Sequence, residues 1–226
     1  MTRRKDPDRI ESSVAGASAP PQPLTREAFC RFCRFLYDRH FVSASGGNLS
    51  ARAGGEILVT PSGASFRDMT PEMVVALDEE GTVLGGGNPT KDLEVHLGIL
   101  RLRPEIRVVC HVHGPSLIAL STLLDPGSDV LPPLTPGFVY FVHPLPMIPF
   151  AVPGTRSLTD AALAHFREPR RSALLLQNHG LITVGKDFQE AVNVAEEVDE
   201  AARIYLITGG RARAIPDEQI EAIKAL

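Results

Sequence analysis

Two histidines separated by one residue, His111 and His113, are the side chains in this sequence best suited to bind a metal ion. They follow two β-branched valines and precede a Gly-Pro pair, a pattern that predicts a short buried strand ending in a break. Because residues two apart in a strand face the same side, both imidazoles are expected to point in one direction. Neutral imidazole is a common zinc ligand. The pair is therefore a candidate metal site, and the alternative is that both histidines are simply packed and hydrogen-bonded.

Three polar stretches upstream are candidates for holding an anion. The run 43–50 contains Gly46-Gly47-Asn48, and residues 60–63 form a second small turn, Thr-Pro-Ser-Gly. Small residues let the backbone come close to a ligand, and free N–H groups there bind anions. A helix is expected to begin at residues 89–92 with Thr90 as its N-cap, so that Lys91 and Asp92 lie at the positive end where phosphate binds. Each stretch also has a plainer interpretation, as a turn or a cap.

Apolar periodicity predicts the elements that carry these residues. His96 follows Asp92 by one helical turn and is expected to be structural or to lie behind the site. His179, in the run Gln177-Asn178-His179-Gly180, is expected at a corner between two strands. Helices are predicted to start after Thr25, after Thr90, at Pro115, at Ser157 or Thr159, and at the capping box formed by Asp187 and Glu190, with a last short one near residue 220. Strands are predicted at residues 57–59, 74–77, 82–84, 108–112, 139–142, 147–150, 173–176 and 181–184.

Composition narrows the class of protein. A chain of 226 residues fits one large α/β domain, and its net charge of −4 comes without a basic block that would indicate a nucleic-acid or membrane partner. No apolar run spans a bilayer and no signal peptide is recognised. Three cysteines fit a reducing cytoplasm, and Cys30 and Cys33 are interpreted as a packing pair. Residues 1–23, rich in Pro, Ser and charge, are predicted to be a disordered tail before a domain at 24–226.

Five stretches together resemble the class II aldolase/adducin family, over about residues 24–215. They are Gly46-Gly47-Asn48-Leu49-Ser50, Thr60-Pro61-Ser62-Gly63, Pro89-Thr90-Lys91-Asp92, His111-Val112-His113 and Gln177-Asn178-His179-Gly180-Leu181, in the order and at the spacing of that family. The resemblance implies an α/β fold of three layers, α/β/α, around a central, largely antiparallel mixed sheet. It also implies a homotetramer with active sites at subunit interfaces.

The resemblance assigns roles to particular residues. Metal ligands fall on His111, His113, His179 and Asp92, and Asp92 is also the acid/base. Three imidazoles and a carboxylate suit Zn²⁺, with Mn²⁺ as an alternative. Such an ion stabilises the enediolate that forms when a carbon–carbon bond breaks. The positions that bind the phosphate of a phosphorylated sugar or sugar acid fall on Gly47, Asn48, Ser62, Gly63, Thr90 and Lys91.

Within the family the sequence is most similar to 3-oxo-tetronate 4-phosphate decarboxylases, through the Pro-Thr-Lys-acid run at 89–92 and the Pro-rich segment 131–136. Asp92 stands where that subgroup is expected to have Glu, and Gly-Pro follows His113 where Ser-Thr is expected. The expected function is a metal-dependent lyase acting on a phosphorylated sugar acid. The alternatives are an aldolase of the L-fuculose-phosphate type, a pentulose-phosphate 4-epimerase, another decarboxylase or lyase acting on a different acid, and an adducin-like binding module without the metal.

Overall fold

A sheet of eight strands forms the centre of the computed structural model, which describes residues 24–226. The strand order is β4-β3-β2-β1-β5-β8-β7-β6. Neighbours are antiparallel except β6 and β7, which are parallel. The predicted mixed, largely antiparallel sheet is therefore confirmed, whereas the predicted disorder of residues 1–23 lies outside the described residues. The strands are β1 (Asn48–Ala53), β2 (Glu56–Val59), β3 (Val75–Leu77), β4 (Val83–Gly85), β5 (Val108–Val112), β6 (Met147–Ile148), β7 (Ala173–Leu176) and β8 (Gly180–Gly185).

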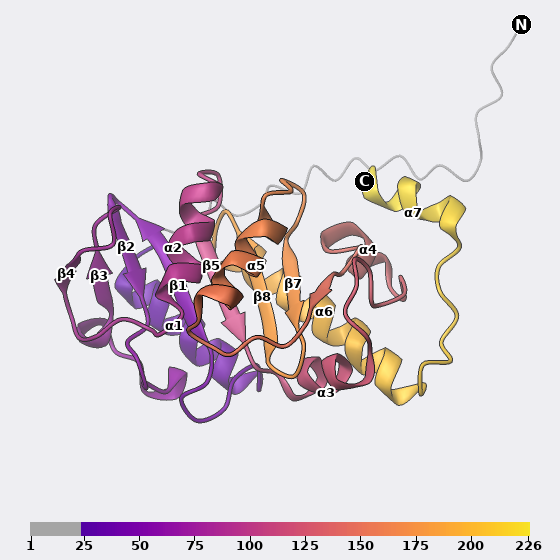
Figure 1. Ribbon diagram of the computed structural model, residues 1–226, viewed down its shortest axis with the longest axis horizontal. Helices are drawn as coiled ribbons and strands as arrows, with labels where there is room; N and C mark the ends of the chain where they lie inside the picture. The colour runs from indigo at the N-terminus through magenta and orange to yellow at the C-terminus, as the bar shows by residue number, and fades with distance from the viewer. Residues whose placement is uncertain (1–23) are drawn as a thin grey trace, which may run out of the picture.

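Helices cover both faces of this sheet, as Figure 1 shows. On one face α2 and α5 pack against a buried apolar cluster, and on the other α1, α3, α4 and α6 share a second cluster. The predicted three-layer α/β/α architecture is thus confirmed. The helices are α1 (Arg26–Asp38), η1 (Phe66–Asp68), η2 (Pro71–Met73), α2 (Leu93–Leu102), α3 (Pro115–Leu123), α4 (Pro136–Phe141), α5 (Arg156–Phe166), α6 (Phe188–Ile207) and α7 (Asp217–Lys224).

Side chains along β5 point alternately to the two faces of the sheet, and this alternation decides which helical layer His111 faces. Cys110 belongs to the apolar cluster under α1 and α6, whereas Val109 belongs to the cluster under α2 and α5. His111 therefore faces α2 and α5, because strand residues two apart share a face. The register places Asn48 opposite His111 and Ser50 opposite Val109. The sheet thus presents Asn48, Ser50 and His111 together to the layer that contains α2.

Most helix starts agree with the predicted caps, and two differ. Thr25 caps α1 and Asp187 caps α6, as predicted. The cap of α5 is Thr155 instead of Ser157 or Thr159. Thr90 does not cap α2, which begins at Leu93; instead the Thr90 N–H donates to the Thr60 carbonyl at 3.1 Å. This pairing holds Thr90 beside Thr60, and the helix begins two residues later than the sequence indicates, with Asp92 at the N-cap position.

The predicted strand at residues 139–142 is wrong, because this segment belongs to helix α4. Thr135 caps the helix by accepting a hydrogen bond from the Phe138 N–H at 3.1 Å, and Pro136 occupies its first turn. Proline at the first helical position is pre-organised for a helix. The β-branched and aromatic residues that favoured a strand instead bury Phe138 and Val139 on one side of this short helix.

Two further findings concern the cysteines and the possibility of a membrane-spanning helix. Cys30, Cys33 and Cys110 are buried and unbonded, and Cys30 and Cys33 pack inside α1 as predicted. Among residues 24–226, no helix combines the length and the apolar character that crossing a bilayer requires.

Candidate metal centre and active site

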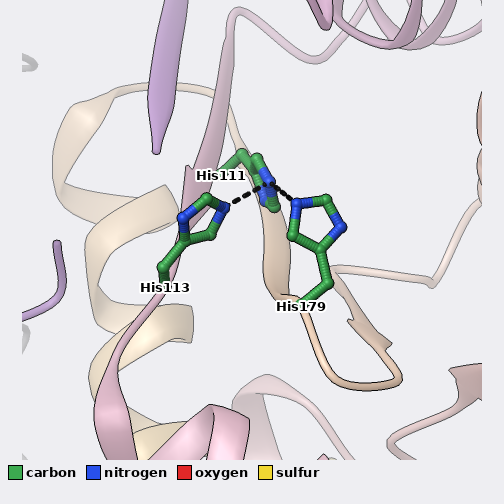
Figure 2. A group of neighbouring side chains, drawn as sticks. All are labelled: His111, His113 and His179. Carbon is green, nitrogen blue, oxygen red and sulfur yellow. Dashed lines mark hydrogen bonds between the residues drawn. The ribbon is translucent and has the colours of Figure 1, made fainter. Parts of the chain in front are cut away.

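Three histidines, two at the end of β5 and one at the corner between β7 and β8, point toward one another, as Figure 2 shows. His111 Nε2 lies 2.9 Å from His113 Nε2 and 3.3 Å from His179 Nε2. One ring nitrogen from each residue lies within 4.8 Å of the others. Two nitrogens on one tetrahedral zinc ion, each bonded at about 2.0–2.1 Å, are about 3.3 Å apart. The spacing of these imidazoles therefore fits the donor set of a single divalent cation.

The protonation of these histidines also suits a metal ligand. Burial, with the neighbouring imidazoles adding to it, lowers the pKa of His111 well below its usual value and that of His113 to about 4. Burial likewise lowers the pKa of His179. All three are therefore neutral near pH 7 and have a nitrogen lone pair to offer. His111 Nδ1 donates to the Leu181 carbonyl at 3.1 Å, which leaves its Nε2 lone pair facing the other two rings.

The corner that carries His179 is built by its neighbours in the sequence. Asn178 has a φ of +56°, and its N–H donates to the buried Ser121 hydroxyl of α3 at 3.0 Å. Gly180 leaves no room for a side chain: a Cβ there would lie 2.2 Å from the Val112 carbonyl oxygen and 2.8 Å from a His113 ring carbon. The absence of a side chain at position 180 therefore lets this corner approach the end of β5, which brings His179 to His113.

A second glycine contact closes the opposite side of the cluster. Gly47 has a φ of +76°, and a Cβ there would lie 2.8 Å from the His111 carbonyl oxygen. A Cβ on Gly46 would lie 2.8 Å from His113 Nδ1. The Gly-Gly pair therefore packs directly against the histidine strand, as well as being a candidate anion-binding turn.

Asp92 lies at the edge of this cluster. The three ligand atoms that group within 4.8 Å come from the histidines alone among the described residues. Asp92 lines the same small cavity as His111, and its charge partly opposes the lowering of the His113 and His179 pKa by burial. Its carboxylate accepts hydrogen bonds from Asn48 Nδ2 at 2.9 Å and from the Gly154 N–H at 3.1 Å. The structure thus holds Asp92 beside the imidazoles through two donors from different elements.

The three candidate anion-binding segments lie side by side. The Leu49 N–H donates to Thr60 Oγ1 at 3.2 Å, and the Ser62 N–H donates to the Asn88 carbonyl at 2.9 Å. A β-bridge joins Pro61 to Pro89. These contacts bring Gly47, Asn48, Ser62, Gly63, Thr90 and Lys91 to one region, where Ser62, Gly63 and Lys91 are exposed and Asn48 and Thr90 are buried. Their suitability for phosphate stays a prediction.

Comparison with known proteins agrees with this geometry. The family described as "Class II Aldolase and Adducin N-terminal domain" matches residues 27–206. The chain belongs to the class II aldolase and adducin family.

Two relatives illustrate its similarities within the family. The 3-oxo-tetronate 4-phosphate decarboxylase of Haemophilus influenzae is 32% identical over 203 residues, which cover 88% of this chain and 95% of the relative. The L-fuculose phosphate aldolase of Methanococcus maripaludis is 33% identical over 179 residues, which cover 79% and 94%. The chain is therefore similar over nearly the whole length of enzymes whose names specify decarboxylation and aldol cleavage.

Solved structures share the fold. YgbL from Escherichia coli matches with a TM-score of 0.80 at 31% identity, covering 88% of this chain and 97% of that one. An L-fuculose 1-phosphate aldolase matches with a TM-score of 0.79 at 26% identity, covering 89% and 94%. The three-layer arrangement is thus that of class II aldolase structures.

Three residues that shape this candidate site were given no role from the sequence, although Ser50 belongs to the Gly46–Ser50 stretch. Ser121 holds the His179 corner, the Gly154 N–H holds Asp92, and Ser50 bonds His96. Gly154 and Ser121 had no local signal, because each acts through a contact with a segment far away in the sequence. His96 is fully buried and bonds two residues of β1, as expected for a residue behind the site.

Proposed function

We propose that this chain is a divalent-metal-dependent lyase that breaks a carbon–carbon bond in a phosphorylated sugar acid, by decarboxylating 3-oxo-tetronate 4-phosphate or a close analogue. The observation that carries the proposal is the convergence of three neutral imidazoles, one buried and two half-buried, beside a carboxylate held by two hydrogen bonds. The similarity to 3-oxo-tetronate 4-phosphate decarboxylases, over nearly their full length, supports the substrate class.

The donor set fits zinc, with manganese as an alternative, and His111, His113 and His179 would hold the ion with Asp92 next to it. When bound, a divalent cation polarises the 3-oxo group of the substrate and stabilises the negative charge that develops there. No chemistry of this kind is available from the imidazoles alone, because burial keeps them neutral.

The chain's own residues have distinct tasks in the proposed reaction. The bond between C1 and C2 of the acid breaks, its electron pair moves toward the 3-oxo group, and C1 leaves as CO₂. C2 then takes a proton, which yields dihydroxyacetone phosphate. Asp92 is assigned to this proton transfer, and the segments around Asn48, Ser62, Gly63, Thr90 and Lys91 to the terminal phosphate.

The position of the tyrosines favours decarboxylation over aldol cleavage. The fuculose-phosphate aldolase pattern includes a C-terminal tyrosine that protonates the aldehyde oxygen, and nothing aromatic follows Tyr205 in this chain. Tyr37 and Tyr205 lie on α1 and α6, and Tyr140 lies on α4 with about half of its surface exposed, 49%. CO₂ is a leaving group without an alkoxide to protonate, so a decarboxylase has less need of this donor.

Aldol cleavage of a ketose 1-phosphate is the second candidate, because L-fuculose phosphate aldolases are also about as similar to the chain, at 33% identity for that of Methanococcus maripaludis. A pentulose-phosphate epimerase would use the same site through cleavage and re-addition. An adducin-like module without a metal is disfavoured by the presence of all four candidate ligands, His111, His113, His179 and Asp92.

The deciding assay supplies the zinc-loaded protein with 3-oxo-tetronate 4-phosphate and, separately, with ketose 1-phosphates and pentulose phosphates. We expect CO₂ and dihydroxyacetone phosphate from the acid. Fast cleavage of a ketose 1-phosphate without CO₂ from the acid would replace the decarboxylase by the aldolase, and interconversion of pentulose phosphates would replace it by the epimerase.

Two further assignments accompany the proposal. We place the protein in the cytoplasm, on its cysteine usage, and assign it a homotetrameric assembly, a state that the class II aldolase resemblance implies. A solution mass near that of one 24.4 kDa chain would contradict the tetramer.

A further inference from the structure

A continuous line of hydrogen bonds runs beneath α2 and ends on Asp92. Ser50 Oγ lies 2.8 Å from His96 Nδ1, and His96 Nε2 lies 2.5 Å from Asn48 Oδ1. Asn48 Nδ2 then lies 2.9 Å from Asp92 Oδ2. Ser50 and His96 are fully buried and Asn48 is nearly so, with exposed fractions of 0%, 1% and 6%. Water does not compete for these contacts, so each polar atom depends on its partner in the line.

The donor and acceptor capacities of these four side chains allow only one direction for the hydrogen bonds. The Asp92 carboxylate only accepts, so the Asn48 amide presents its NH₂ to Asp92 and its oxygen to His96. The Asn48 oxygen also only accepts, so His96 must donate from Nε2. Burial lowers the pKa of His96 to about 4, which leaves the ring neutral, so Nδ1 accepts and the Ser50 hydroxyl donates to it. Each of the three contacts therefore joins a donor to an acceptor, and the reversed amide would break this match at both Asp92 and His96.

We infer that His96 is a positioning residue: by donating to Asn48 Oδ1 it fixes the orientation of the Asn48 amide, which holds the Asp92 carboxylate and turns the second Nδ2 hydrogen toward an anionic group of the substrate. The inference rests on the proposed role of Asp92. Without the His96 donor, the amide is free to turn over. A reversed amide sets its oxygen against the Asp92 carboxylate, where two acceptors repel, and removes an N–H donor from the anion site.

Two substitutions at His96 separate this role from simple packing. His96→Gln keeps an N–H at about the position of Nε2, whereas His96→Leu fills space without a donor. Outer-shell hydrogen-bond partners of metal sites typically contribute about 10–100-fold in activity or metal affinity. We expect His96→Leu to lower kcat by about 10–100-fold and His96→Gln to retain most of it, with similar losses of Tm. His165→Leu, which removes a half-buried histidine of α5 that bonds the Ala173 carbonyl, is the matched control and is expected to leave kcat unchanged.

Equal losses of kcat in His96→Leu and His96→Gln would overturn the inference, since packing alone would then explain the residue. A measurement on the wild-type protein covers the case in which His96→Leu does not fold. Long-range ¹H–¹⁵N correlation spectra report which ring nitrogen of His96 carries the proton. A proton on Nε2 is the expected result, and a proton on Nδ1 would overturn the inference. This measurement needs no substrate, so a protein that releases no CO₂ would refute the proposed reaction while the spectrum still decides the role of His96.

Discussion

At the scale of single residues, the site depends on side chains that are held neutral or held in one orientation. His111 is neutral because it is buried, and its ring is fixed because Nδ1 donates to the Leu181 carbonyl. Asp92 is restrained by donors on both carboxylate oxygens, Asn48 Nδ2 on one and the Gly154 N–H on the other. Such restraint reduces the reorganisation needed at the moment of reaction, which is how preorganised sites gain rate.

The substitution Asp92→Asn tests the proton-transfer role directly. The amide preserves the shape of the side chain and is unable to accept a proton. General acid–base groups typically contribute about 10²–10⁴ in rate, so kcat is expected to fall by that factor while Tm stays close to wild type. Metal content is measured in parallel, because a lower content would show that Asp92 also ligates the ion.

The control for this substitution is Asp160→Asn, which alters an exposed carboxylate of α5 that pairs with Arg156 at 3.5 Å. It is expected to leave kcat unchanged. An Asp92→Asn variant with kcat close to that of wild type would remove Asp92 from the mechanism.

Predictions about single residues succeeded where the spacing of two residues in a strand decides the direction in which their side chains point. The His-x-His pattern was enough to bring His111 and His113 together, because alternation in a strand is a local property. His179 came only from the family resemblance, since no local pattern shows that a corner 66 residues later reaches the same point. The bond from Ser50 to His96 was also beyond the sequence, because it depends on the register between β1 and β5 and on how α2 lies over them.

At the scale of elements, close backbone approach at Gly180 assembles the metal centre. The substitution Gly180→Ala would place a Cβ 2.2 Å from the Val112 carbonyl oxygen, so β8 or β5 must move. Overpacking of this kind typically costs about 1–3 kcal/mol, and here the movement also separates His179 from His113. We expect a lower free energy of unfolding in urea together with weaker zinc binding by titration calorimetry.

Gly87→Ala is the matched control, because a Cβ at that position meets nothing within 4 Å. Its stability and zinc affinity are expected to remain close to those of wild type. Should Gly180→Ala bind zinc as tightly as Gly87→Ala, the backbone contact at position 180 would not be what places His179.

Elements with long periodic patterns and most of the short strands were predicted correctly, whereas the segment at residues 139–142 was not. The apolar stripes and caps of α1 and α6 are repeated over several turns, so local signals agree with the fold. Residues 139–142 form part of a six-residue helix, too short for periodicity to outweigh β-branched composition. The start of α2 was displaced because a tertiary contact, the hydrogen bond from Thr90 to Thr60, competes with capping.

At the scale of the whole molecule, buried neutral histidines link stability to pH. Burial lowers the pKa of His96, His113 and His165 to about 4, whereas the unfolded chain takes up protons near pH 6.5. Between these values the unfolded state binds more protons than the folded state. The contribution of these histidines to the free energy of unfolding is therefore complete above about pH 6.5 and is lost as the pH falls toward 4. Each histidine that stays neutral steepens this loss by at most about 1.4 kcal/mol per pH unit.

Urea unfolding of chelator-treated protein at pH 7, 6 and 5 measures this dependence without metal. The free energy of unfolding is expected to decrease steadily over that series, and His165→Gln is expected to make the decrease shallower. Stability that stays level or rises from pH 7 to pH 5 would contradict the assignment of these histidines as buried and neutral.

The measurement that tests the central claim most directly is the metal content of the protein purified without chelator. Elemental analysis is expected to find about one divalent ion per chain, zinc above all, and to find almost none in His111→Ala or His179→Ala. The control is His165→Ala, which removes an imidazole outside the cluster and is expected to keep the ion. A wild-type protein without a divalent ion, even after incubation with zinc, or an undiminished content in His111→Ala and His179→Ala, would contradict a metal centre built from these three histidines.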